Sequence, residues 1–175
     1  MTGQNDGGPS VPDVTIRRAW TAADIDAGRA LIAEYAAWLE RDHGIGLAFQ
    51  GIHAELEGLL GAYTPPSGAL FVAFGSGGQP CGCVALRMFR GGICEIKRLY
   101  VRPATRGTGL GDRLIKTILQ EARALGYAQA CLDTAGFMAG ALALYRAHGF
   151  AETGAYYDNP LPDITYLSCR LDPTS

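Results

Sequence analysis

The segment 93–126 places the strongest restriction on how this chain can fold. Residues 93–101 form a largely apolar run, and Pro103 prevents a strand from continuing because proline has no N–H to pair. Glycines follow at positions 107, 109 and 111, and apolar residues then recur at helical spacing from 110 to 125, before Gly126. The segment predicts a strand, a glycine loop and a long amphipathic helix in direct succession.

The helices and strands before and after this segment are predicted from the spacing of their apolar residues. Thr21 and Asp24 resemble a capping box at the start of a helix that ends near Gly44. The predicted order is β-α-α-β-β-β-α-β-α-β-β. The strands are expected at 14–20, 69–74, 82–89, 93–101, 127–134, 150–157 and 164–171, and the helices at 22–44, 52–60, 110–125 and 138–148.

The length of the chain fits one domain. Its 175 residues are 48% hydrophobic, which is enough to fill a single core. Residues 1–13 are polar and rich in Gly and Pro, so they are predicted to form a flexible N-terminal tail before a single domain over 14–172. No apolar stretch approaches the roughly 18 residues that span a bilayer, so no membrane association is expected.

Charge and cysteine content exclude further classes. The net charge of −2 lacks the basic excess of a nucleic-acid-binding protein, so no nucleic-acid partner is expected. The five cysteines form no CxxC pair and the three histidines are dispersed, which argues against a metal site. Reduced thiols in a cytoplasmic protein are the expected state. The cysteines are Cys81, Cys83, Cys94, Cys131 and Cys169.

The glycine loop has the properties of an anion-binding site. The first N–H groups of a helix have no partner within it, and they lie at the positive end of its dipole. Residues 97–116 also hold six of the fifteen cations and one acid, Asp112. A plain turn with solvated cations is the alternative. A P-loop would need Gly-Lys-Ser/Thr at the start of the helix, and this sequence has none there. A dinucleotide-binding loop would need a glycine at position 112, which is Asp112 here.

Two motifs carry a resemblance to a known family. Arg106-Gly-Thr-Gly-Leu-Gly111 is similar to the R/Q-x-x-G-x-G/A signature of the GCN5-related N-acetyltransferases (GNAT), and Ala141-Leu-Ala-Leu-Tyr-Arg-Ala-His-Gly-Phe150 to their A-x-x-L-Y-x-x-x-G-F segment. The chain resembles small bacterial members whose acceptors are unassigned. The resemblance implies an α/β fold of three layers, with a mixed, mostly antiparallel sheet of about seven strands and four helices.

The resemblance also implies a reaction and a site. The reaction is direct transfer of acetyl from acetyl-CoA to an amine, without a metal. Tyr145 is expected to protonate the departing thiolate, and Glu95 to accept the amine proton directly or through water. The pantetheine arm would pair with Leu99, Tyr100 and Val101. Backbone N–H groups would hold the pyrophosphate; they belong to Arg106, Gly107, Thr108, Gly109, Leu110 and Gly111.

Several assignments have structural alternatives. Tyr145 also fits a core aromatic, and strict alternation puts Glu95 on one face with Lys97, which suits an ion pair equally well. Met138 stands where many members have Asn, so the contact of that Asn with pantetheine is lost or replaced. Asp133 ends a strand and either lines the cleft or forms a turn.

The acceptor is expected to be a primary amine of a small molecule or peptide. Its pocket is predicted within 38–63 and 156–166, with Asp42, His43, Phe49, Gln50 and Tyr63 as candidates. Homodimers are common among relatives, which leaves a homodimer open. Two other functions fit the same loop: a CoA-binding regulatory module without catalysis and a nucleotide-binding module.

Overall fold

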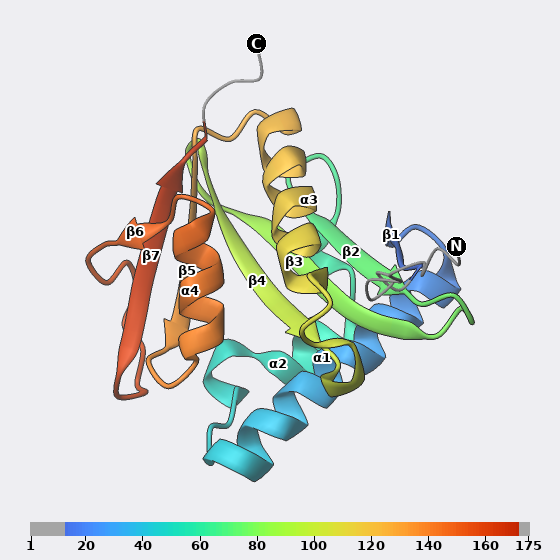
Figure 1. Cartoon of the computed structure of the whole chain (residues 1–175). Helices are drawn as coiled ribbons and strands as arrows, with labels where there is room; N and C mark the ends of the chain where they lie inside the picture. Colours follow the sequence, from blue (N-terminus) through green and yellow to red (C-terminus); the bar gives the residue numbers. More distant parts are fainter. Residues whose placement is uncertain (1–12, 172–175) are drawn as a thin grey trace, which may run out of the picture.

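A computed structural model of the chain describes residues 13–171. It holds one seven-stranded sheet in the order β1-β2-β3-β4-β5-β7-β6 and four α-helices (Figure 1). The strands are β1 (Thr15–Arg18), β2 (Ala69–Phe74), β3 (Pro80–Arg90), β4 (Ile93–Val101), β5 (Gln129–Ala135), β6 (Ala151–Glu152) and β7 (Ile164–Arg170). The helices are α1 (Ala22–His43), α2 (Ile52–Glu57), α3 (Leu110–Ala124) and α4 (Ala139–Ala147).

The predicted order of strands and helices is confirmed, as is the mixed sheet. The capping box at the start of α1 is present, with Thr21 and Asp24 each bonding the other's backbone N–H. The predicted tail lies outside the described residues except for Asp13. None of the described helices combines the length and the apolar character needed to cross a membrane.

One predicted strand is wrong over most of its length. Residues 150–157 were expected to be extended, but β6 is only Ala151–Glu152. The rings of Tyr156, Tyr157 and Tyr166 contact one another with centroids 5.2–5.8 Å apart. Aromatic contacts of this kind stabilise the loop over the sheet, in place of continued strand pairing.

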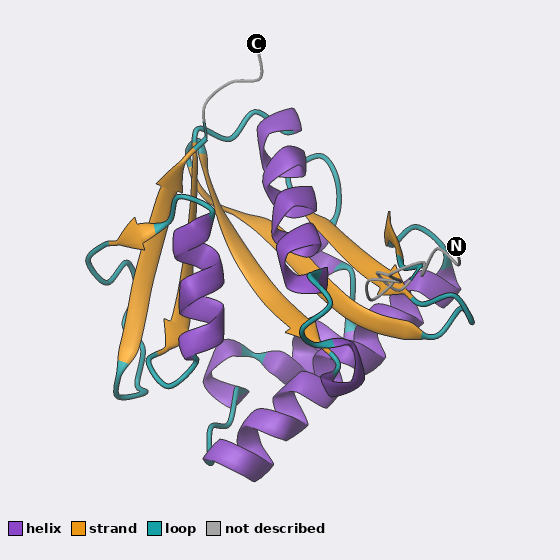
Figure 2. Cartoon of the chain, viewed as in Figure 1, coloured by secondary structure: helices purple, strands orange, loops and turns teal. Residues whose placement is uncertain are grey.

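Helices α3 and α4 cover one face of the sheet and α1 covers the other (Figure 2). An apolar core lies beneath each of these layers. The buried stripe of α3, which includes Leu114, Ile115 and Ile118, packs with α4 on one face. On the other face, Leu31 and Ile32 of α1 pack beside residues of β2 and β3. Side chains of successive strand residues point to opposite faces, so β4 serves both cores.

The sheet opens between β4 and β5. These neighbours are the one parallel pair among the described strands, and their pairing covers only Ile93–Glu95 against Gln129–Cys131. Beyond that point β5 continues to pair with β7 along its whole length, while β4 turns away (Figure 1). Arg98 has a φ of 59°, a left-handed conformation within β4. The second half of β4 therefore has a free edge toward β5.

Candidate active site

A groove of about 730 Å³ lies beside the free edge of β4. It is bounded by the end of α1, by the glycine loop with the start of α3, and by the start of α4. Every residue predicted to bind the cofactor lines it except Thr108, whose hydroxyl donates to the Thr105 carbonyl at 2.7 Å and holds the loop. The lining residues predicted from the sequence are Leu99, Tyr100, Val101, Arg106, Gly107, Gly109, Leu110 and Gly111.

The glycine loop offers free backbone donors to this groove. Gly107 and Gly109 have φ values of 75° and 80°, which other residues adopt only with strain. Gly109 is the N-cap of α3 and supplies no side-chain cap. The first N–H groups of α3 therefore lack helical partners, and the positive end of the helix dipole lies beside them. A pyrophosphate fits this arrangement.

The cations near the loop do not gather there as their sequence positions suggested. Only Arg106 lines the groove, with its guanidinium 5.6 Å from the Trp38 ring centroid. Arg102 pairs with Glu34 at 2.9 Å. The remaining partners follow: Arg113 donates to the Val14 carbonyl, Lys116 pairs with Asp112, and Lys97 and Arg98 lie beneath α2 and its preceding turn. Backbone N–H groups, rather than a cation cluster, are thus the main anion ligands available.

Tyr145 lies in a second cavity that shares Leu99 and Met138 with the groove. It projects from α4 into this small cavity of about 90 Å³ between the diverging strands. The side chain is almost buried, and burial raises the pKa of its phenol. Its hydroxyl has no hydrogen-bond partner among the described residues. Every fully buried polar side-chain atom of these residues does have a partner, so the Tyr145 hydroxyl is not fully buried. The hydroxyl therefore faces the cavity, where a neutral phenol can donate a proton.

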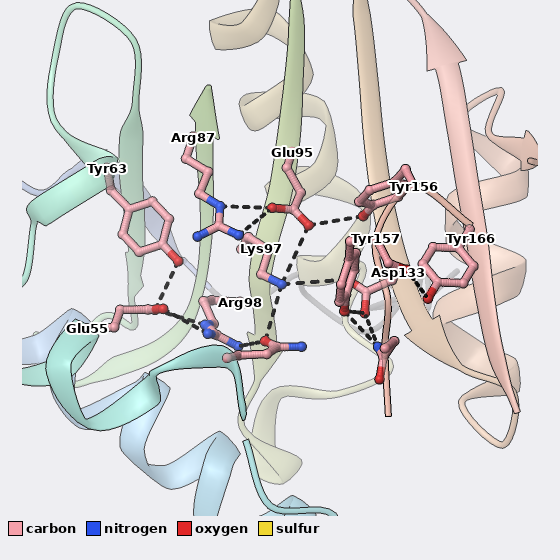
Figure 3. Close-up of polar contacts among 12 residues, drawn as sticks. Glu55, Tyr63, Arg87, Glu95, Lys97, Arg98, Asp133, Tyr156, Tyr157 and Tyr166 are labelled. Carbon is pink, nitrogen blue, oxygen red and sulfur yellow. Dashed lines mark hydrogen bonds and ion pairs between the residues drawn. The ribbon is translucent and has the colours of Figure 1, made fainter. Parts of the chain in front are cut away.

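Glu95 lies on the face of β4 opposite to Tyr145, and only 2% of its surface is exposed (Figure 3). Its Oε2 accepts from Arg87 Nε at 2.8 Å and pairs with Arg87 Nη2 at 2.7 Å. Its Oε1 accepts from the Tyr156 hydroxyl at 3.0 Å. The ion-pair alternative raised by the sequence is thus present, with Arg87 as the principal partner, while Lys97 lies farther away at 3.7 Å. A role as base stays a prediction.

Lys97 connects Glu95 to a second carboxylate, that of Asp133 at the end of β5. The Lys97 Nζ lies 3.6 Å from Asp133 Oδ1 and 3.2 Å from Gln50 Oε1 (Figure 3). Asp133 Oδ2 accepts from the Tyr157 hydroxyl at 2.7 Å and from Asn159 at 3.3 Å. Asp133 lines the same cavity as Tyr145, so it lies in the cleft and is not merely part of a turn.

A third cavity, of about 320 Å³, adjoins these residues on the α2 side. Gln50, Lys97 and Arg98 line both this cavity and the one that holds Tyr145. Its full lining is Phe49, Gln50, Arg87, Phe89, Glu95, Lys97, Arg98, Tyr157 and Asp158. The third cavity thus adjoins the cavity of Tyr145 through these three shared residues.

The residues predicted for the acceptor pocket lie in four different places. Gln50 and Phe49 line the third cavity. His43 instead lines the groove, where its ring stacks on Phe137 at 4.1 Å, and Asp42 pairs with Arg41 at the surface. Tyr63 is buried and donates to Glu55 at 2.9 Å. Sequence reasoning missed Arg87, whose one signal was its place on the strand preceding that of Glu95.

Arg98 is held in the site by a buried ion pair with Glu55 of α2. Both of its bonds to the Glu55 oxygens measure 2.8 Å. Burial alone would raise the pKa of Glu55, but these bonds hold it below its usual value. The resulting stabilisation is present above the unfolded pKa and is lost as pH falls through the lower folded pKa.

Glu55→Gln is expected to lower the free energy of unfolding by about 3 kcal/mol, because it leaves Arg98 buried without a counter-charge. Its melting temperature should also fall less steeply than that of the wild type below about pH 4.3. Chemical denaturation and melting curves measure both effects. Exposed Glu57 on the same helix provides the control, since Glu57→Gln should stay within about 0.5 kcal/mol. Equal losses in the two variants would contradict the ion-pair account.

The described cysteines are all free and buried. Burial raises the pKa of the Cys94 and Cys131 thiols to about 12, so they are protonated at neutral pH. Residues 13–171 contain no group of three or more His, Cys, Asp or Glu side chains that would hold a metal ion.

Comparison with known proteins agrees with this geometry. The sequence model of the Acetyltransferase (GNAT) family matches residues 51–150. An uncharacterized N-acetyltransferase of Schizosaccharomyces pombe is 39% identical over 160 residues, which cover 91% of this chain and 96% of the relative. An uncharacterized N-acetyltransferase of Escherichia coli is 32% identical over 149 residues, covering 82% of this chain and 81% of that relative.

Solved structures share the fold. A GNAT-family acetyltransferase of Staphylococcus aureus superposes with a TM-score of 0.74 at 16% identity, covering 91% of this chain and 99% of its own. A phosphinothricin acetyltransferase of Sinorhizobium meliloti in complex with acetyl-CoA gives 0.65 at 20% identity, covering 90% and 88%. The protein is thus an acyltransferase by class. It belongs to the GNAT family, whose general reaction is acetyl-CoA-dependent N-acetyl transfer.

Proposed function

We propose that this protein transfers the acetyl group of acetyl-CoA directly to a primary amine of a small molecule or peptide, in a ternary complex. The observation that carries the proposal is the continuity of the site. A groove of about 730 Å³ runs from the free N–H groups at the start of α3, past the free edge of β4, to the start of α4, the helix that carries Tyr145. Acetyl-CoA fits such a groove, because its pyrophosphate can bind at the start of α3 while its long arm carries the thioester toward α4.

The residues on both sides of the groove have distinct binding roles in this proposal. The N–H groups of residues 107–111 hold the pyrophosphate. The N–H of Arg106, which the resemblance also implied, instead donates to the Pro103 carbonyl at 3.2 Å. Leu99, Tyr100 and Val101 receive the pantetheine arm as an added strand would be received at a sheet edge. Met138 lines the groove where many members carry Asn, so it offers an apolar contact in place of an amide.

Proton transfer decides what the remaining residues must do. An amine of lysine type has a pKa of about 10.4, so only about one in 2,500 is neutral at pH 7 and able to attack a carbonyl. A carboxylate can take that proton directly or through water, and the sheet offers two candidates, Glu95 and Asp133. The Tyr145 phenol is neutral at pH 7 at its ordinary pKa of about 10, and burial raises that pKa further. It protonates the departing thiolate.

Ligand binding separates this proposal from the other functions of the same loop. Saturating acetyl-CoA, at about 100 times its Kd, should stabilise the protein by about 2.7 kcal/mol and raise its melting temperature. ATP and NAD at equal concentration should shift it less. Thiol release with an amine panel then distinguishes an enzyme from a CoA-binding regulatory module. A larger shift with ATP or NAD would reject acetyl-CoA as the ligand.

The proposal also includes expectations about cellular location and oligomeric state. The five free, buried cysteines support a cytoplasmic location, where thiols stay reduced. A homodimer stays a prediction from the resemblance, to be measured by sedimentation in the presence and absence of acetyl-CoA.

A further inference from the structure

Some hydrogen-bond donors and acceptors around the two adjoining cavities have no partner among the described residues. Arg87 reaches Glu95 through Nε and Nη2, and its side chain is 38% exposed along the third cavity. Its Nη1 has no hydrogen-bond partner among the described residues. The outer edge of the guanidinium, formed by Nη1 and the second hydrogen of Nη2, is therefore open for a planar anion.

Gln50 supplies a second unmatched donor. Its Oε1 accepts from both Lys97 Nζ at 3.2 Å and Arg98 Nη1 at 3.0 Å. Two cationic donors require an oxygen at that position, so the chemistry fixes which amide atom is which. Nε2 is then directed away from both cations, and it has no partner among the described residues.

The unmatched acceptor lies in the other cavity. Asp133 Oδ2 takes two donors, from Tyr157 and Asn159, whereas Oδ1 has only Lys97 Nζ at 3.6 Å. By contrast, both oxygens of Glu95 are occupied at 3.0 Å or less. Asp133 Oδ1 therefore has a free lone pair in the cavity that Tyr145 lines.

We infer that the acceptor is a small amine that also carries a carboxylate, the chemical class of the amino acids. The carboxylate binds the open edge of Arg87 and Gln50 Nε2, and the ammonium group binds Asp133 Oδ1. This inference rests on the proposed function and names its substrate class. It also assigns proton acceptance to Asp133 and gives Glu95 a positioning role, because Glu95 holds the guanidinium of Arg87.

Size and charge of the third cavity agree with this class. About 320 Å³ is at the lower end of small-molecule sites. Phe49, Phe89 and Tyr157 provide aromatic walls for a side chain. Three cations line the cavity, namely Arg87, Lys97 and Arg98, which disfavours an acceptor with a second positive charge.

The transfer step balances with these groups. The ammonium group gives one proton to Asp133 Oδ1, and the neutral nitrogen attacks the acetyl carbon. An N–C bond forms and the C–S bond breaks with its electron pair on sulfur. The thiolate takes the proton of Tyr145. The acylated nitrogen gives up its second proton to the Tyr145 phenolate, which restores the phenol, and the proton on Asp133 passes to solvent. The products are the N-acetyl amino acid and the free thiol of CoA.

Matched acceptor pairs test the inference. Each amino acid is compared with the amine that lacks its carboxylate, such as phenylalanine with 2-phenylethylamine and valine with isobutylamine. Thiol release at saturating acetyl-CoA gives kcat/KM, and mass spectrometry identifies the product. At least one amino acid should exceed its matched amine by tenfold or more.

Arg87→Lys links the preference to the open edge. A lysine keeps a cation beside Glu95 but offers no second planar edge. It should lower kcat/KM for the preferred amino acid at least tenfold more than it lowers kcat/KM for the matched amine. Arg90→Lys, an exposed position on the same strand, is the control and should change neither.

Three outcomes would overturn the inference. They are equal transfer to both members of every pair, equal losses with both acceptors in Arg87→Lys, and turnover restricted to amines without a carboxylate. In each of them the proposed acetyltransferase function stands. Absence of thiol release with every amine, in a protein that binds acetyl-CoA, would reject the function together with the inference.

Discussion

Tyr145→Phe is expected to lower kcat by about 100-fold or more, the usual contribution of a positioned general acid. The hydroxyl donates to no protein group among the described residues, so its loss removes the proton donor without breaking a contact. The Kd of acetyl-CoA, measured by calorimetry, should stay within about twofold. Because burial raises the pKa of the Tyr145 phenol, its ionisation should not reduce wild-type activity below about pH 10.

Tyr127→Phe is the matched control for this variant. Tyr127 belongs to the same apolar core, but its hydroxyl donates to the Ser67 carbonyl at 2.6 Å. Its removal should cost about 1 kcal/mol of stability and leave kcat unchanged. If Tyr145→Phe kept its kcat, or lost stability and activity together as a core defect would, Tyr145 would be a packing residue and not the acid.

Gly109→Ala should raise the Kd of acetyl-CoA at least tenfold, equivalent to about 1.4 kcal/mol. The N-cap has a φ of 80°, so a Cβ strains the backbone that aims the first N–H groups of α3. The new methyl group would also project from the loop that lines the groove, where no described protein atom lies within 4 Å. Calorimetric titration measures the change directly.

Gly126→Ala separates this effect from strain alone. Gly126 follows the other end of α3 and has a φ of 84°, and a Cβ added there would likewise meet no described atom within 4 Å. Both variants should lose about 1–2 kcal/mol of stability, while only Gly109→Ala weakens binding. Equal binding losses would show that the loop amides are not the ligands of the pyrophosphate.

The structure changes how the charged residues near the loop are interpreted. Their density in the sequence suggested an anion site made of side chains, yet most of them pair elsewhere. Lys116 pairs with Asp112 four residues earlier on the same helix, a spacing that the sequence does show. Arg102, by contrast, pairs with Glu34, 68 residues away, and Arg113 donates to the distant Val14 carbonyl. Such pairings depend on which elements become neighbours, and local periodicity carries no information about that.

Local patterns in the sequence were sufficient to predict the elements and the loop. Apolar periods, a proline and glycines act within a few residues, so they predict a strand, a turn and a helix wherever the segment lies in the fold. The two motifs likewise placed Tyr145 downstream of the loop. One strand failed, at 150–157, because ring contacts among Tyr156, Tyr157 and Tyr166 outweigh its local pattern.

Which charges meet depends on how the elements assemble. Arg87 faces Glu95 because the antiparallel register of β3 and β4 puts them opposite each other. Asp133 reaches Lys97 because β4 and β5 part just beyond Glu95. The register of the strands and the point at which they separate depend on packing over the whole sheet. The type of one residue does not predict which residue, distant in the sequence, will lie next to it in space.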